Sequence, residues 1–566
     1  MTTRGTTIAF IAGLLLVGCK HDRTSDPSAT TLTTLTSAAV PPDAPPATVI
    51  SKTAKLGVIS MSAVVYAAPS DTAKKIGYLR LGTVIARTDK DQGTEGCPGG
   101  WYGVAPRGFV CIGKNATLDL DTPLLRAASV RPDTSKPLPY SYGFIRAVAP
   151  LYLRVPTKDE QLATEFKLTP HLSYWYRKGK KLNHADHVGA NDAAREIIPD
   201  APVQPPSNTL SDAILLGGAT DADPVPFWLD GGRRAIPNVS AIDVPPKAVF
   251  ANRARRHTGI AFIGSFSTGP EPENRPFAVT VDMRLVPMDK IKPEPASAFH
   301  GIELKDDVRL PLAFARPCNP NAKGTPLPCV HTYRDDAGEL KKTDNVLPTR
   351  GLVLLTGTQR VGKVGDRDVR FLETKTGAWV RASDVGVARG PDLWPQAAQR
   401  AEKWIDVSIA DQTLVLWEGK TPVYATVVST GQDGLQDPKT SKATPLGTFR
   451  IKSKHVTTTM DSNGRSAQSG GAAPESGESA SPTDDDKHAG NFELRDVPYV
   501  QYFQEGYALH SAYWHDHFGL PRSHGCVNIA PIDALRVFRF TDPPVPEGWH
   551  GMNVESGKGT TVVIHP

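Results

Sequence analysis

The C-terminal part of the sequence holds a cysteine and a histidine at a spacing that could support nucleophilic catalysis. Cys526 follows directly on Ser523, His524 and Gly525, and His510 stands sixteen residues upstream at the end of a predicted strand. A thiol becomes a good nucleophile when a nearby base takes its proton, and the base must itself be oriented. A sheet that brings His510 beside Cys526 would meet this requirement, but spacing alone does not prove that the two meet.

A short helix is expected just after the cysteine. Its first turn would contain Pro531 and Asp533, and its buried face would contain Ile532, Leu535 and Phe538. Cys526 would then stand just before a helix N-terminus, where the positive end of the helix dipole favours a thiolate.

The elements that must position these residues are predicted to be antiparallel strands. Alternating or apolar runs separated by turns predict strands over 404–409, 413–417, 423–428 and 499–510, and a short helix over 391–403 leads into them. The stretch 458–490 is rich in Ser, Gly, Asp and Ala, so we expect a mobile insertion inside the domain.

These motifs resemble the signature of the L,D-transpeptidase, or YkuD-like, catalytic domain. That signature is an upstream His, a spacer of about a dozen residues, then Ser/Thr-His-Gly-Cys, a hydrophobic residue and Arg or Asn. This chain has His510 and then the run SHGCVN over 523–528. The STG at 429–431 and the TPLGTF at 444–449 resemble two further family elements. The resemblance covers about 404–566 and implies a β-sandwich-like fold with mixed sheets.

The resemblance implies a role for each residue of the motif. Cys526 would be the nucleophile, and His510 would be the general base that activates it and later protonates the leaving amine. Ser511 would orient His510 through its backbone carbonyl. His524 and Gly525 would shape the oxyanion region, together with the backbone N–H of Cys526.

The implied substrate is a peptidoglycan tetrapeptide stem, which Asn528 and Ser523 would contact or help to orient. The cysteine would attack the carbonyl of the third stem residue, D-Ala would leave, and the amine of another stem would resolve the thioester into a 3→3 cross-link. The resemblance implies no metal and no organic cofactor.

Other functions stay open at this point. Water as acceptor would make the protein an L,D-carboxypeptidase, and an amine of an outer-membrane protein would make it a protein-to-wall attachment enzyme. A metal site could use the cluster of His510, His515, His517, His524 and Cys526, although its spacing fits no common zinc pattern. We interpret His515 and His517 as loop residues near the entrance. A non-catalytic wall-binding lipoprotein is the remaining alternative.

The N-terminus predicts export and anchoring. Residues 1–19 have Arg4 followed by a short apolar run, which is typical of a secretory signal. The end of this segment resembles a bacterial lipobox, which implies lipidation of Cys19. Residues 20–54 are predicted to be a flexible tether. The expected location is the periplasm or cell envelope on a lipid anchor, and Lys20 favours the outer membrane.

Export would place the remaining cysteines in an oxidising compartment, where disulfides form. Cys97 and Cys111 flank one Gly/Pro-rich turn sequence, and Cys318 and Cys329 flank another, so local disulfides are expected, although the sequence does not fix the connectivity. Cys526 is then left over as a reactive or a buried thiol.

The rest of the chain predicts further β-rich modules, so the fold class is mainly β and multidomain. Residues 55–115 resemble a bacterial SH3-like domain, a small β-barrel, with Trp101 and Tyr102 in its core or groove. Residues 137–298 are read as a β-rich module of unknown role with one strand over 277–286, and 299–390 as a diverged second SH3-like module. The pair His184 and His187 lacks a third metal ligand and is read as a polar loop.

Length and composition agree with this organisation. The chain has 566 residues and contains 49 Gly and 50 Pro, which favours turns and linkers over helical bundles. A net charge of +5 gives no electrostatic support for nucleic-acid binding. No apolar run is long enough for a membrane-spanning helix.

Overall fold

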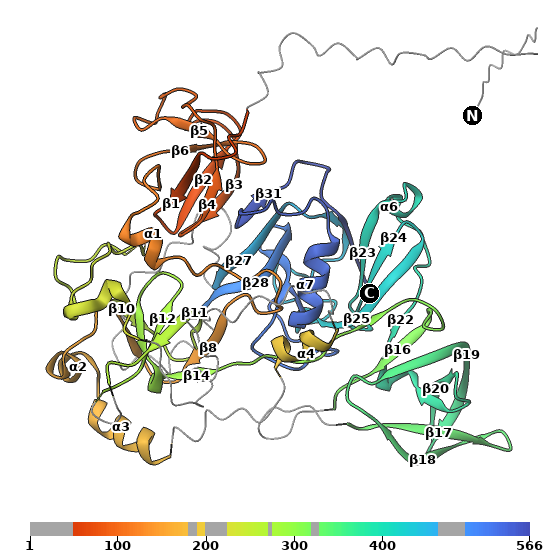
Figure 1. Ribbon diagram of the computed structural model, residues 1–566. Coiled ribbons are helices and arrows are strands. Elements are labelled where there is room, and N and C mark those ends of the chain that lie inside the picture. The colour runs from red at the N-terminus through yellow and green to blue at the C-terminus, as the bar shows by residue number, and fades with distance from the viewer. Residues whose placement is uncertain are drawn as a thin grey trace, which may run out of the picture. The chain divides into compact units, whose positions relative to one another are not determined.

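The computed structural model describes residues 49–178, 189–197, 224–240, 242–269, 274–318, 328–461 and 493–566. Every element below lies in the unit formed by residues 48–566 (Figure 1). The predictions for the signal segment, Cys19, most of the tether, and the pair His184 and His187 fall outside the described residues. No helix in the described part of the chain has the length and apolar character needed to cross a membrane.

The first module is a small set of antiparallel strands. They are β1 (Lys55–Val58), β2 (Ser62–Tyr66), β3 (Lys75–Arg80), β4 (Val84–Ala86), β5 (Trp101–Gly103), β6 (Phe109–Cys111) and β7 (Ala116–Thr117). Strand β1 pairs with β4 and β7, and β2 pairs with β3 and β6. Trp101 is 1% exposed, so of the two expected places it takes the core. Helix α1 (Pro123–Ala127) follows.

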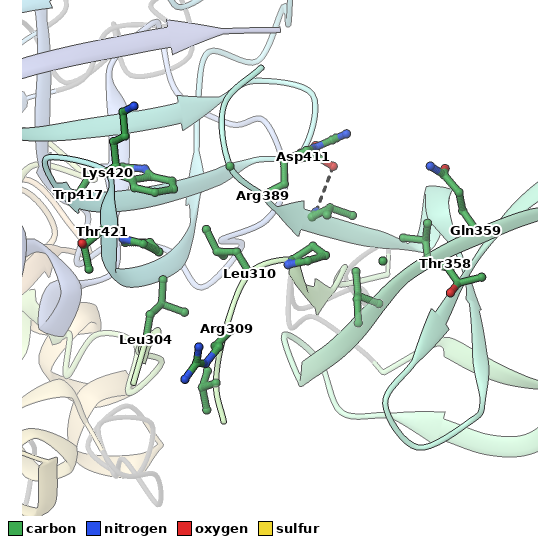
Figure 2. Close-up of a pocket in the computed structure, with 18 of the residues that line it drawn as sticks. Leu304, Arg309, Leu310, Thr358, Gln359, Arg389, Asp411, Trp417, Lys420 and Thr421 are labelled. Atoms are coloured by element: carbon green, nitrogen blue, oxygen red, sulfur yellow. Dashed lines mark hydrogen bonds and ion pairs between the residues drawn. The ribbon is translucent and has the colours of Figure 1, made fainter. Parts of the chain in front are cut away.

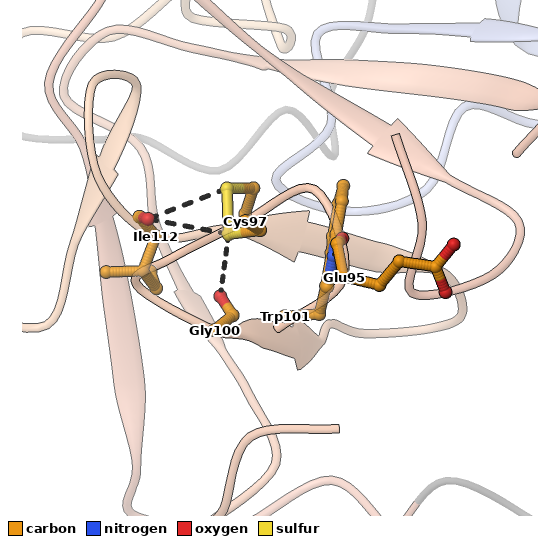
Figure 3. Close-up of a disulfide and its surroundings, with 6 residues drawn as sticks. Glu95, Cys97, Gly100, Trp101 and Ile112 are labelled. Carbon is orange, nitrogen blue, oxygen red and sulfur yellow. Dashed lines mark hydrogen bonds between the residues drawn. A yellow bond between two sulfur atoms is a disulfide. The ribbon is translucent and has the colours of Figure 1, made fainter. Parts of the chain in front are cut away.

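A disulfide joins Cys97 to Cys111 in this module, with the two Cα atoms 5.8 Å apart (Figure 3). Beside it, the Trp101 indole N–H donates to the carbonyl of Glu95 at 2.6 Å. A second disulfide joins Cys318 to Cys329. Together they leave Cys526 as the free cysteine of the described residues.

The second module combines strands and helices. Its strands are β8 (Ser141–Ile145), β9 (Ala149–Tyr152), β10 (Phe250–Ala254), β11 (Gly259–Phe266), β12 (Phe277–Thr280), β13 (Leu285–Pro287) and β14 (Ile291–Pro293), and its helices are α2 (Lys158–Thr164), α3 (Leu168–Arg177), α4 (Ala190–Ile197) and the 3₁₀ segments η2 (Phe227–Gly232) and η3 (Met288–Lys290). The prediction of one strand over 277–286 is wrong. Met283 adopts a φ of 61°, and the Thr280 N–H donates to the carbonyl of Arg284, so the run folds back as the hairpin β12–β13.

A seven-stranded sheet follows. Its strands are β16 (Leu312–Ala315), β17 (Val330–Asp336), β18 (Glu339–Leu347), β19 (Leu352–Val364), β20 (Arg367–Thr374), β21 (Trp379–Arg381) and β22 (Val385–Ala388), in the order β18-β17-β21-β20-β19-β16-β22. The 3₁₀ segment η4 (Ala382–Asp384) precedes β22. The chain turns at 305–308 before this sheet, and the first strand of the sheet begins at Leu312.

The C-terminal domain contains two sheets that share one strand. Its elements are α6 (Gln396–Gln399), β23 (Lys403–Ser408), β24 (Thr413–Glu418), β25 (Thr421–Ser429), β26 (Gly447–Arg450), β27 (Ser453–Asp461), β28 (Glu493–Gln504), β29 (Tyr507–Ser511), β30 (Val527–Ile529), α7 (Pro531–Phe540), β31 (Gly551–Asn553) and β32 (Thr561–His565). One sheet runs β26-β32-β23-β24-β25, with β15 (Ile302–Glu303) at its edge, and the other runs β31-β27-β28-β29-β30-β25.

The core of this domain lies between these strands and α7. Leu414 and Val562 from the first sheet and Leu509 and Val527 from the second belong to one buried cluster, which also contains Leu535 of α7. The predicted hairpins over 404–428 and the buried face of α7 are confirmed.

Two predicted boundaries in this domain are wrong. The helix over 391–403 shortens to Gln396–Gln399, because Pro395 stands at its N-cap and Ala401 has a φ of 54° just beyond its end. The insertion does not begin at residue 458, because β27 continues to Asp461. The rest of the predicted insertion, 462–490, lies outside the described residues.

Candidate active site

Parallel pairing of β29 with β30 brings the predicted histidine and cysteine to neighbouring strands. His510 is the partner of Asn528, and Leu509 is the partner of Val527. Cys526 stands one residue before β30, which places it beside Ala508 on β29. Because side chains alternate between the two faces of a sheet, residues 508, 510, 526 and 528 share one face. The cysteine and the histidine are therefore diagonal neighbours on that face.

Cys526 is a partly buried thiol. Its Sγ lies 3.7 Å from the carbonyl oxygen of Gly506, and it packs against an apolar cluster that includes Ala508. Burial raises the pKa of Cys526 to about 11. The expected stabilisation of a thiolate by the helix dipole is not found, because β30 intervenes and α7 begins only at Pro531.

His510 is buried, with 3% of its surface exposed. Its Nδ1 donates to the carbonyl of Ser511 at 3.0 Å, which leaves Nε2 as the unprotonated nitrogen of the neutral ring. Burial lowers the pKa of His510 to about 4. The ring of Trp514 stacks on the imidazole, with centroids 5.6 Å apart. Within the described residues His510 makes no hydrogen bond to Cys526, and such bonds often tighten only when substrate is bound.

The turn before the cysteine is built around Ser523 and Gly525. The Ser523 hydroxyl donates to the carbonyl of Cys526 at 2.5 Å and accepts the Gly525 N–H at 3.0 Å. Gly525 has a φ of 120°, and a Cβ there would lie 2.6 Å from a ring carbon of Tyr507. Only glycine fits this position, for reasons of both backbone conformation and space.

The two upstream motifs hold this turn in place. The Ser523 N–H donates to the carbonyl of Thr430 at 3.0 Å. The Thr444 hydroxyl accepts the Gly431 N–H and donates to the Gly525 carbonyl, both at 2.8 Å. The STG and TPLGTF motifs thus both contact the cysteine turn, although they lie 80 or more residues before it in the sequence.

Asn528 contacts a histidine that sequence reasoning assigned to the entrance. The side-chain amide of Asn528 lies 3.0 Å from Nε2 of His515, whose Nδ1 accepts the His517 N–H at 3.3 Å. A neutral imidazole has one acceptor nitrogen, so the Asn528 amide satisfies both contacts when its oxygen faces His515. Burial lowers the pKa of His515 to about 3, which keeps the ring neutral.

Three residues near the motif were not individually picked out from the sequence as parts of the site, namely Tyr507, Trp514 and Thr444, and His515 was placed only near the entrance. Tyr507 packs on Gly525 and donates to the carbonyl of Pro438 at 3.1 Å. The available signals were that Tyr507 lies on the strand of His510 and that Thr444 opens the TPLGTF motif. Trp514 and His515 carry no such local signal, because only the folded loop brings them onto the site.

His524 differs from its neighbours because its side chain is exposed at the rim. Burial of part of the ring lowers its pKa, and Lys442 adds to this effect. Among the described residues, no group of three or more His, Cys, Asp and Glu side chains is arranged to hold a metal ion.

A cavity of about 910 Å³ lies elsewhere, between the seven-stranded sheet and the first sheet of the C-terminal domain (Figure 2). Arg309, Arg389 and Lys420 line it together with Trp417 and Asp411. None of its lining residues belongs to the cysteine motif.

Comparison with known proteins gives the class of the C-terminal domain. Residues 402–564 match the family model of the L,D-transpeptidase catalytic domain, YkuD. This part of the chain is therefore an L,D-transpeptidase catalytic domain, as the motifs predicted. None of the curated proteins compared with the chain matches it.

Several solved structures are similar to part of the chain. A mutant of the L,D-transpeptidase of Enterococcus faecium is 18% identical with a TM-score of 0.19, and the match covers 29% of this chain and 49% of that one. L,D-transpeptidase 3 of Mycobacterium tuberculosis is 18% identical with a TM-score of 0.19, covering 37% and 79%. The L,D-transpeptidase of Mycobacterium smegmatis is 13% identical with a TM-score of 0.20, covering 47% and 100%. The chain thus spans about half the length of the first of these relatives.

Proposed function

We propose that the protein is a cell-wall L,D-transpeptidase that cross-links peptidoglycan by cysteine acyl transfer. The observation that carries the proposal is the parallel register of β29 and β30, which puts the free Cys526 and the buried His510 on one sheet face inside a domain that matches this family.

The reaction follows from the resting charges of the pair. The raised pKa of Cys526 and the lowered pKa of His510 favour a neutral thiol beside a neutral imidazole. His510 Nε2 takes the thiol proton as Sγ attacks the carbonyl carbon of the third stem residue, and the same proton then goes to the departing amine of D-Ala. A thioester on Cys526 remains. The amine of a second stem attacks it, the new amide forms, and the sulfur regains a proton.

Each residue around the pair has a proposed part in this reaction. The Cys526 N–H would stabilise the oxyanion of the tetrahedral intermediate, in a turn shaped by Gly525 and His524. Ser511 would fix the tautomer of His510. The Asn528 and Ser523 side chains would orient the site or contact the substrate.

The cellular setting is part of the proposal. Two disulfides suit an oxidising compartment outside the cytoplasm. Lipidation of Cys19 and a tether over 20–54 would anchor the protein in the envelope, and an SH3-like module over 55–115 would face the wall. The seven-stranded sheet is offered as the second SH3-like module only on its sequence rhythm.

The direct test is incubation of the purified protein with a disaccharide-tetrapeptide, followed by mass spectrometry of the products. Cross-linked dimers are expected. Tripeptides alone would instead identify an L,D-carboxypeptidase, and stem attachment to a protein amine would identify an attachment enzyme. Cys526→Ala and His510→Ala should abolish all products. If the wild-type protein forms no product and no covalent adduct between the stem peptide and Cys526, only the non-catalytic wall-binding alternative remains.

A further inference from the structure

The loop between β29 and β30, residues 512–522, is held by side chains that precede the catalytic domain in the sequence. Two guanidinium nitrogens of Arg350 donate to Asp516, one to its backbone carbonyl and one to Oδ2, both at 2.8 Å. The Ser297 hydroxyl donates to Oδ1 of the same carboxylate at 2.5 Å. Both oxygens of the Asp516 side chain are therefore bound from outside the domain.

Further contacts follow along the loop. Phe299 stacks on Phe518 with ring centroids 6.5 Å apart, and the Arg350 guanidinium lies 4.9 Å from the Phe299 ring centre. Arg316 donates to the carbonyl of Gly519 at 3.3 Å. Residues that precede the catalytic domain thus contact the outer side of the loop at three positions, 516, 518 and 519.

The inner side of the same loop touches the reacting residues. Trp514 stacks on His510, and His515 contacts Asn528, so two consecutive rings lie directly on the site. Asp516 is the next residue along the chain. A shift of Asp516 would move both rings, because only one or two peptide units separate them.

The backbone at Arg350 supports a role for this clamp. Arg350 has a φ of 59°, in the turn between β18 and β19, a conformation that a long side chain rarely adopts and that glycine tolerates without strain. Its side chain is only 11% exposed. A strained residue persists where other contacts hold it. The Arg350 backbone N–H donates to the carbonyl of Ala315 on β16, and the side-chain contacts run to the loop and to Phe299.

We propose that Arg350 and Asp516 are positioning residues that couple the seven-stranded sheet to acyl transfer by holding Trp514 and His515 against the catalytic pair. This inference rests on the proposed function and assigns a task to a module that otherwise has none. Neither residue touches the reacting atoms, and both act through the loop.

The chain offers a matched control on the same sheet. Arg360 donates to the carboxylate of Asp335 at 2.8 Å and lies 4.9 Å from the ring of Trp379, the same pair of contacts that Arg350 makes, but it does not touch the loop. With the full-length protein, Arg350→Ala should lower kcat for disaccharide-tetrapeptide turnover about tenfold to a hundredfold and shift its pH profile, because misplacing catalytic groups by about 1 Å has effects of that size. Arg360→Ala should leave both unchanged. Equal kinetics in the two variants would overturn the proposal.

Two further substitutions separate positioning from stability. Arg350→Gly removes the clamp and also relieves the strained φ. It should therefore lose activity as Arg350→Ala does, while its Tm stays at least as high as the Tm of Arg350→Ala. Arg350→Lys keeps one ion pair to Asp516 and should recover part of the rate. A rate loss that simply tracks the Tm across these variants contradicts positioning.

Alkylation of Cys526 by iodoacetamide, followed on its own peptide by mass spectrometry, keeps this inference distinct from the proposed function. If the wild type turns over no stem peptide, the proposed function fails. The alkylation rates alone then test whether Arg350 influences the surroundings of Cys526. A changed rate or pH dependence in Arg350→Ala but not in Arg360→Ala supports the clamp. Identical alkylation in both refutes it.

Discussion

Burial sets the resting charge of the two central side chains. The Cys526 thiol and the His510 imidazole both sit where the charged form is disfavoured, so the pKa of the thiol rises to about 11 and that of the imidazole falls to about 4. The pair therefore differs from the thiolate–imidazolium pair that a helix dipole would have favoured. In the proposed reaction, proton transfer to His510 therefore accompanies the attack of the sulfur on the substrate.

This charge state predicts how Cys526 reacts with pH. Because the thiolate fraction grows tenfold per pH unit below the pKa, the alkylation rate of Cys526 should rise steadily from pH 7 to about 10 without a plateau. Rates measured with excess iodoacetamide on the native protein check this. A plateau near neutral pH would show that the thiol is already ionised. His510→Ala should leave the slope in place, because the neutral ring adds no charge beside the sulfur.

At the scale of elements, the turn that holds Cys526 depends on two motifs that lie far from it in the chain. Thr444, at the start of TPLGTF, joins the Gly431 N–H of STG to the Gly525 carbonyl of the cysteine turn. The Ser523 N–H of the turn also donates to the carbonyl of Thr430, and β25, which precedes Thr430, pairs with β30. The STG motif, the TPLGTF motif and the cysteine turn over 523–526 are thus joined by hydrogen bonds into one unit, which we call the corner.

The Thr444 hydroxyl should matter for both stability and rate. Thr444→Val leaves the Gly431 N–H and the Gly525 carbonyl without their partner in a buried place, which should cost about 1–3 kcal/mol of unfolding free energy and lower activity. Thr448→Val in the same motif is the control, because Thr448 is exposed. Urea unfolding and product formation measure the two effects. Equal behaviour of the two variants would show that the corner does not position the nucleophile.

At the scale of the whole unit 48–566, a buried polar network joins the first module to the catalytic domain. Arg80 on β3 pairs with Asp496 on β28 at 2.6 Å. The Asp496 carboxylate also accepts the Thr457 hydroxyl at 2.9 Å, and that hydroxyl lies 2.9 Å from His550 Nε2. Tyr78 contacts Nδ1 of His455 at 3.2 Å. The junction is therefore held by one ion pair and by hydrogen bonds that two neutral histidines make to Tyr78 and Thr457.

These histidines predict a loss of stability in mild acid. Burial lowers the pKa of His455 to about 4 and that of His550 well below its usual value. Between pH 6.5 and about 4 the unfolded chain binds protons that the folded one does not, so the free energy of unfolding falls as the pH falls, by on the order of 1–3 kcal/mol per histidine. Urea titrations at pH 7.5, 5.5 and 4.5 measure this. His550→Gln should flatten the dependence, whereas the exposed His257→Gln should not.

Much of the C-terminal domain follows from local pattern. Alternating apolar residues located β23 to β25, and Pro531 with the apolar spacing after it located α7. The pattern failed where a turn is made by backbone conformation and polar contacts, as at Met283, or where a strand continues into polar sequence, as at Asp461. Such features depend on neighbouring strands and leave no periodic signal.

Residue types and their order alone predicted the family of this domain and picked out Cys526 and His510 as the proposed nucleophile and base, because a cysteine motif of this kind is local. Only the tertiary structure decided that β29 and β30 run in parallel register, that Thr444 closes the cysteine turn, and that Arg350 reaches Asp516 from 166 residues away. These are long-range contacts, whose geometry is set by packing of the whole chain and is not encoded in any short stretch of it.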